Sequence, residues 1–126
     1  EFPDFQFGLT GSPAEEELCR GIALHCLASN PEVFAGHLSL TDSVKLISEA
    51  TLLVANESGS VHIAAGSGTP CVCISNGNHF GRWNPYPESV AADIIWVLDH
   101  HSKTALLDGG SALAFNACVH LSQREY

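Results

Sequence analysis

Two kinds of hydrophobic pattern alternate along this chain: short continuous apolar runs, and longer segments with helical spacing. The continuous runs cover residues 5–9, 51–55, 71–75 and 92–98. Continuous rather than alternating hydrophobicity is typical of strands that are covered on both faces, as in a parallel sheet. These runs therefore predict a sheet with helices packed on both sides.

The first helix is predicted over about residues 12–28. Ser12 is a favoured N-cap residue, Pro13 suits the first helical position, and Glu15 can close a capping box with Ser12. Residues with helical spacing give this helix one apolar face, made of Leu18, Ile22, Ala23, Cys26 and Leu27.

Three further helices are predicted. Thr41 is expected to cap the second, which ends near Ala50 and buries Val44, Leu46 and Ile47. The third follows Ser58, and its small residues allow it to lie close to the sheet. The last covers residues 111–123 after a Gly109-Gly110 break, with a modest apolar set of Leu113, Ala117 and Leu121.

Alternation of strands and helices predicts an α/β fold with a Rossmann-like parallel sheet and flanking helices. With 126 residues, the chain is expected to form a single domain, in which residues 100–126 are a C-terminal loop and helix. Residues 33–38 fit either a short strand or an extended connector.

The formal net charge of −9 argues against nucleic acid or an anionic membrane surface as a partner. No apolar run approaches the roughly 20 residues that a membrane-spanning helix requires. The first residues do not resemble a signal peptide, and methionine is absent, so we expect a piece of a longer or processed chain. The 5 cysteines include no C-x-x-C pair, which favours reduced thiols and a cytoplasmic location over a zinc or dithiol site.

The junction between the run at 51–55 and the next helix is a candidate anion site. The first N–H groups of a helix have no acceptor inside it, so those of Gly59, Ser60 and Val61 can hold a phosphate. The hydroxyls of Ser58 and Ser60 add donors, and ligands of parallel α/β folds bind at the carboxyl ends of strands.

Two side chains beside this junction extend the hypothesis. Glu57 can accept hydrogen bonds from sugar hydroxyls, and His62, about one helical turn in, can donate to a diphosphate oxygen. The alternative is a plain capped helix, in which the Ser58 hydroxyl satisfies a helix N–H and His62 packs against the sheet.

The polar loop at residues 76–89 carries further candidates: Asn78, His79 and Arg82. Arg82 is one of only 5 basic residues and can pair with a phosphate through two N–H groups. The alternative is that Arg82 packs on or pairs with a neighbour in its own loop: Trp83, Tyr86 or Glu88.

Other catalytic motifs fail on inspection. A serine-hydrolase elbow needs glycine where Asn56 and Ser60 stand, the P-loop lysine is absent, and no G-x-G-x-x-G follows a strand. His100 and His101 follow Asp99, which suggests either a metal site or, as the better interpretation, a solvated loop. We therefore predict no metal and no cofactor.

Residues 40–87 resemble glycosyltransferase family 9, the heptosyltransferase type, and the similarity extends over roughly residues 5–90. That family carries an Asn-Asp/Glu-Ser/Thr-Gly, His-x-Ala-Ala, Gly-x-Pro signature. The matching residues here are Asn56, Glu57, Ser58, Gly59, His62, Ala64, Ala65, Gly68 and Pro70.

The resemblance implies the C-terminal, donor-binding half of a GT-B glycosyltransferase, which has two Rossmann-like domains. It implies a nucleotide-sugar donor such as ADP-heptose, with Glu57 on the sugar, the backbone at Ser58 and Gly59 on the phosphates, and His62 on the diphosphate. It also implies metal-independent transfer to a lipopolysaccharide core acceptor at the cytoplasmic face of the inner membrane.

Two departures from the family pattern affect the prediction. The acceptor-binding domain with the catalytic base is absent, so no catalytic residue is assigned here and the isolated chain is expected to be inactive. The first strand of the donor domain and its lysine-bearing turn are also expected to be missing before Glu1, so the strands near residues 5 and 51 are expected to lose a shared neighbour. Alternative functions are a non-catalytic nucleotide or sugar-phosphate binding module and an interaction domain without a small ligand.

Overall fold

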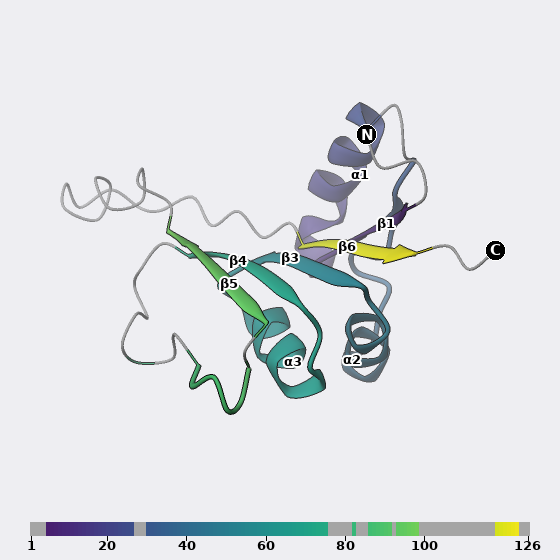
Figure 1. Ribbon diagram of the computed structural model, residues 1–126. Helices are drawn as coiled ribbons and strands as arrows, with labels where there is room; N and C mark the ends of the chain where they lie inside the picture. Colours follow the sequence, from purple (N-terminus) through teal and green to yellow (C-terminus); the bar gives the residue numbers. More distant parts are fainter. Residues whose placement is uncertain are drawn as a thin grey trace.

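The described chain forms a six-stranded sheet with helices on both faces, as Figure 1 shows. The computed structural model describes residues 5–26, 30–75, 82, 86–91, 93–98 and 118–123. The strands are β1 (Phe5–Thr10), β2 (Glu32–Val33), β3 (Leu52–Asn56), β4 (Cys71–Ser75), β5 (Ile94–Leu98) and β6 (Cys118–Gln123). A 3-10 turn (Pro13–Glu15) leads into α1 (Glu16–His25), and α2 (Leu40–Ser48) and α3 (Gly59–Ser67) follow. The predicted α/β, Rossmann-like architecture is confirmed.

The strand order is β2-β1-β6-β3-β4-β5. β1 pairs in parallel with β2, and β3, β4 and β5 form a second parallel group. β6 runs antiparallel to both β1 and β3, so β1 and β3 point in the same direction. Their carboxyl ends therefore lie at the same edge of the sheet.

β6 corrects two predictions. Residues 118–123 form a strand, whereas a helix was predicted over 111–123; residues 111–117 lie outside the described part. β6 also fills the position between β1 and β3, so the expectation that these two strands lack a shared neighbour is wrong. The physical reason is that backbone groups on both sides of that position require partners, which a strand supplies and a helix does not.

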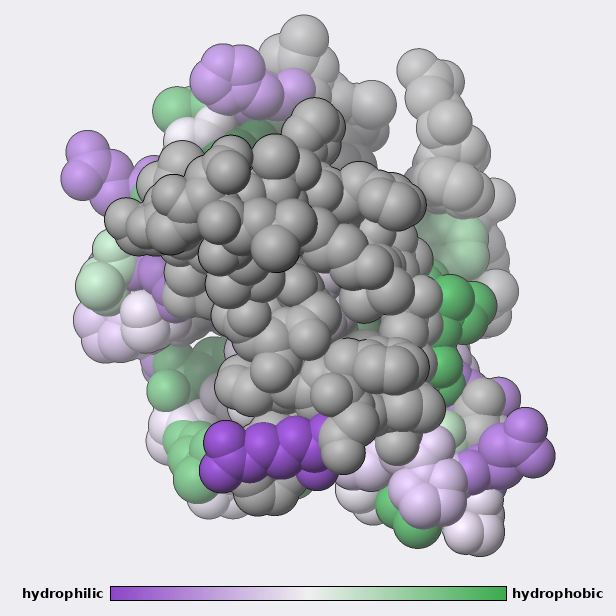
Figure 2. Space-filling view, turned by 90° about the vertical axis from the view of Figure 1, so that its left-hand side faces the viewer, coloured by the Kyte–Doolittle hydropathy of each residue, from purple (hydrophilic) through white to green (hydrophobic). Residues whose placement is uncertain are grey.

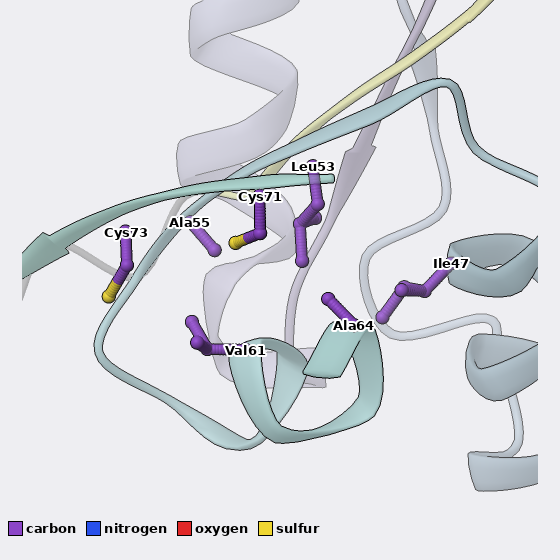
Figure 3. Close-up of a cluster of buried hydrophobic side chains, with 7 residues drawn as sticks. All are labelled: Ile47, Leu53, Ala55, Val61, Ala64, Cys71 and Cys73. Atoms are coloured by element: carbon purple, nitrogen blue, oxygen red, sulfur yellow. The ribbon is translucent and has the colours of Figure 1, made fainter. Parts of the chain in front are cut away.

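Two separate core clusters pack against the two halves of the sheet. One joins β3 and β4 to α2 and α3, and Figure 3 shows its strand side chains directed toward Val61 and Ala64 of α3. Its members are Ile47, Leu53, Ala55, Val61, Ala64, Cys71 and Cys73. The other, between β1 and α1, contains Leu9, Cys19 and Ala35. Cys71 and Cys73 point to the same side, as predicted, and neither forms a disulfide within the described residues.

The buried face of α1 includes Ile22 and Ala23, as predicted, but is centred on Cys19, which was not among the predicted residues. Cys19 is fully buried, with Ile22 and Ala23 packed beside it, while Leu18 is 44% exposed. A 3-10 turn, with about three residues per turn, precedes α1 and changes which residues face the sheet. In α2, Ile47 is buried as predicted, but Val44 is exposed. In Figure 2, hydrophobic and hydrophilic residues of the described chain are interspersed on the face shown.

The N-cap of α2 is Ser39 and not the predicted Thr41. The Ser39 Oγ accepts a hydrogen bond from the Asp42 N–H at 3.1 Å, and the Ser39 N–H donates to Asp42 Oδ2 at 3.3 Å. This reciprocal pair is a capping box, which places Thr41 inside the first helical turn.

Replacing Ser39 by alanine is expected to lower the free energy of unfolding by about 1 kcal/mol, because the helix loses its N-cap acceptor. Thr41→Ala is the matched control and should change stability by less than about 0.5 kcal/mol, since Thr41 is an exposed position within the helix. Urea denaturation followed by circular dichroism measures both. If Thr41→Ala lowered the free energy of unfolding more than Ser39→Ala, the result would show that Thr41 is the N-cap.

Candidate functional site

The loops that follow β1 and β3 enclose a cavity of about 330 Å³ at the carboxyl edge of the sheet. From β1 the chain crosses outward to β2, and from β3 it proceeds in the other direction to β4 and β5. Their carboxyl ends thus form a topological switch point, which is where open α/β sheets bind ligands. The lining residues are Thr10, Gly11, Ser12, Glu15, Leu38, Leu40, Ser43, Ile47, Ser58, Gly59, Ser60 and Ile63.

One wall of the cavity is the start of α3. Ser58 has an extended backbone and makes no side-chain capping bond, while its carbonyl accepts the Val61 N–H at 3.1 Å. The hydroxyl of Ser58 therefore does not satisfy a helix N–H, contrary to the capped-helix alternative. Gly59 and Ser60 are the first two residues of the helix, and both line the cavity. Positive partial charge at this end of α3 faces the cavity edge.

Predicted site residues divide into two groups. Ser58, Gly59 and Ser60 line the cavity. Glu57 and His62 flank that stretch without lining it, and Val61 is 1% exposed in the core. The Val61 N–H donates to the Ser58 carbonyl, and the part of this junction that lines the cavity is Ser58 to Ser60.

The opposite wall, after β1, contains a carboxylate that the sequence analysis treated only as a helix cap. Glu15 Oε2 accepts hydrogen bonds from the N–H and the hydroxyl of Ser12, both at 2.7 Å. The other oxygen, Oε1, is buried and has no hydrogen-bond partner among the described residues. A buried polar atom without a partner costs about 1–3 kcal/mol, which makes Oε1 a candidate acceptor for a ligand. One feature of the sequence could have indicated this role: Glu15 shortly follows the apolar run that forms β1, and β1 points in the same direction as β3.

Gly36 holds this wall in place. Its N–H donates to the Gly11 carbonyl at 3.0 Å, and its φ of 79° lies in the left-handed region that favours glycine. A Cβ at this position would also lie 3.1 Å from Pro13 Cα. The connection after β2 is therefore fixed against the loop after β1.

Glu57 is held at the end of β3 by the neighbouring strand. The Ser75 hydroxyl donates to Glu57 Oε2 at 2.5 Å, and the Glu57 N–H donates to the Ile74 carbonyl at 3.2 Å. Ser75 is 2% exposed and was not among the predicted site residues. The sequence feature that could have indicated Ser75 is a polar residue at the end of the apolar run that forms β4, the strand next to β3. The contact orients the Glu57 carboxylate.

His62 lies in the first turn of α3 and is exposed, so it does not pack against the sheet as the capped-helix alternative requires. Its Nδ1 is hydrogen-bonded to the hydroxyl of Tyr86, and the two rings meet edge to face with centroids 5.9 Å apart. Burial, and then the charge of Cys73, raise the pKa of Tyr86 above its ordinary value.

The remaining candidates are less well placed. Arg82 is exposed and does not line the cavity, while Asn78 and His79 lie outside the described residues. Asn56, the first residue of the signature, ends β3 with a buried Nδ2 that has no partner in the described part of the chain.

Within the described ranges, no group of three or more His, Cys, Asp or Glu side chains is placed to hold a metal ion. Asp99, His100 and His101 fall outside those ranges. No helix of the described chain is long and apolar enough to cross a membrane.

These features define a Rossmann-like α/β protein with a ligand-sized cavity at its switch point. A model of glycosyltransferase family 9 (heptosyltransferase) matches residues 4–107, and the chain belongs to this family. The resemblance drawn from the sequence is thereby confirmed, and glycosyl transfer between a sugar donor and an acceptor is the role that the family carries. No curated protein and no solved structure matches the chain.

Proposed function

We propose that this chain binds the nucleotide-sugar donor, with ADP-heptose as the expected molecule, in transfer to a lipopolysaccharide core acceptor. The start of α3 carries the proposal, because it opens without a side-chain cap into the switch-point cavity. In this proposal the diphosphate lies against Gly59 and Ser60, whose N–H groups and partial positive charge suit an anion.

Carboxylates on both sides of the cavity suit the hydroxyl-rich parts of such a donor. Glu57, oriented by Ser75, accepts from the sugar, and Glu15 Oε1 accepts from another hydroxyl of the ligand. A volume of about 330 Å³ is at the lower end for ligand pockets, so the cavity encloses only part of a nucleotide-sugar. The rest of the donor would extend past Glu57 and His62.

The chemistry of transfer explains why the helix start matters. An acceptor hydroxyl forms a bond to the anomeric carbon, the bond from that carbon to the diphosphate oxygen breaks, and the acceptor proton passes to a base. Negative charge develops on the departing diphosphate, where fixed N–H donors stabilise it more than they stabilise the ground state. With these donors and His62 on the leaving group, the proposed transfer is metal-independent.

The chain's part in this reaction is donor binding. The proposal places the acceptor and the catalytic base on a second domain of a GT-B enzyme, working at the cytoplasmic face of the inner membrane. The chain alone is then expected to bind donor without transferring it.

A matched pair of glycines in α3 tests the proposal. An added Cβ at Gly59 or at Gly66 meets no atom within 4 Å, so alanine fits at both positions. Either change should keep or raise stability, by about 0.4–1 kcal/mol. Gly59→Ala places a methyl group where the diphosphate approaches and should weaken ADP-heptose binding at least about tenfold, or 1.4 kcal/mol. Gly66→Ala, at the other end of the helix, should bind normally.

Isothermal titration calorimetry with ADP-heptose, ADP, UDP-glucose and GDP-mannose measures these affinities. Equal affinity of the Gly59→Ala and Gly66→Ala variants would place the diphosphate elsewhere and contradict the proposal. No binding of any of the four ligands to the unaltered chain would also contradict it. A protein that contains this chain together with the acceptor-binding domain is then assayed for transfer. If it binds the donor but does not transfer the sugar, the result supports a non-catalytic binding module instead.

A further inference from the structure

The pairing of His62 with Tyr86 joins two distant parts of the chain. The residues are 24 positions apart, so no local turn or helix brings them together. Neither belongs to a core cluster, and His62 is exposed. The contact nevertheless combines a hydrogen bond at one ring nitrogen with an edge-to-face ring arrangement at 89°. Together these two interactions fix both the orientation of the imidazole and the partner of Nδ1.

The direction of this hydrogen bond follows from acidity. A phenol is a stronger acid than a neutral imidazole N–H, and an imidazole nitrogen is a stronger base than a phenol oxygen. The favoured arrangement therefore has the Tyr86 hydroxyl donating to Nδ1 of neutral His62. The raised pKa of Tyr86 supports this, because it keeps the hydroxyl protonated.

The bond at one imidazole nitrogen determines the role of the other. When Nδ1 accepts, the hydrogen is on Nε2, and a neutral His62 presents an N–H donor. Phosphate oxygens act only as acceptors, so this tautomer attracts a diphosphate, whereas the opposite tautomer would direct a lone pair at it.

We propose that Tyr86 is a positioning residue for the donor site: its hydroxyl holds His62 as the Nε2–H tautomer, directed to donate to the diphosphate of the nucleotide-sugar. This inference rests on the proposed function. His62 then serves as a donor without carrying a positive charge, and Tyr86 acts through His62 without touching the ligand.

The tautomer is tested on the ligand-free chain by long-range ¹H–¹⁵N NMR of the imidazoles. The spectra are recorded at a mildly alkaline pH. The His62 signals are identified by their loss in His62→Gln. We expect hydrogen on Nε2 and a hydrogen-bonded, unprotonated Nδ1, whose resonance shifts in Tyr86→Phe. Hydrogen on Nδ1, or no shift in Tyr86→Phe, would overturn the proposal, whatever the ligand results.

A double-mutant cycle tests the action through His62. Tyr86→Phe keeps the ring contact and removes only the hydroxyl, so it should weaken ADP binding about fivefold. In a His62→Gln background the same change should alter binding less than twofold. An equal loss in both backgrounds would show that Tyr86 acts structurally or on the ligand itself, and would overturn the positioning role. If ADP does not bind at all while the NMR result holds, the donor-binding proposal fails and the tautomer assignment stands.

Discussion

His120→Pro is expected to lower the free energy of unfolding by about 3 kcal/mol or more. His120 lies in the middle of β6, in register with Gly8 of β1 on one side and Leu53 of β3 on the other. Proline has no N–H to give to either neighbour, and its ring does not fit inside a ladder, so it is confined to edge strands and bulges. Chemical denaturation followed by circular dichroism measures the loss.

His120→Thr provides the control, because threonine keeps the backbone N–H and favours strands. This variant should stay within about 1 kcal/mol of the unaltered chain. Similar stabilities for the proline and threonine variants would show that β6 does not occupy the centre of the sheet.

The same strand connects the two parts of the candidate site. Each half of the sheet has its own core cluster, one with Leu53 and the other with Leu9, and β6 is the strand hydrogen-bonded to both halves. The cavity takes one wall from each half, with Glu15 on one side and Gly59 on the other. The distance between these walls therefore depends on the pairing of β6 with β1 and β3.

Local patterns were sufficient to predict most elements of the fold. The apolar run at 71–75 became β4 without change, because Pro70 precedes it and a polar loop follows. The start of α3 after Ser58 was likewise predicted from a local pattern, an apolar run that ends in Asn-Glu-Ser-Gly. The segment at 118–123 was not, because its apolar residues fit either periodicity: Leu121 continues a helical spacing, while Val119 and Leu121 also alternate as in a strand. The position open between β1 and β3 decides the outcome, and that is a tertiary effect.

The same distinction separates the site residues that were predicted from those that were missed. Ser58, Gly59 and Ser60 belong to one strand–helix junction, so their sequence is enough to place them together. Ser75 and Tyr86 contact partners 18 and 24 residues away, and neither contact follows from spacing. Glu15 was read correctly as part of a capping box, but that role uses only one carboxylate oxygen.

Leu53→Ala should lower the free energy of unfolding by about 2–5 kcal/mol, because it leaves a cavity beneath α3. Leu53 has 0% exposure and belongs to the larger core cluster. Ile95→Ala, at a position with 63% exposure on β5, is the matched control and should cost less than about 1 kcal/mol. Denaturation curves compare the two variants, and equal losses would contradict the assigned core.

At temperatures where it remains folded, Leu53→Ala should still bind ADP-heptose, since Leu53 does not line the site cavity. Gly59→Ala should show the reverse, with full stability and weakened binding, so the two variants separate the residues that hold α3 in place from those through which its start meets the ligand.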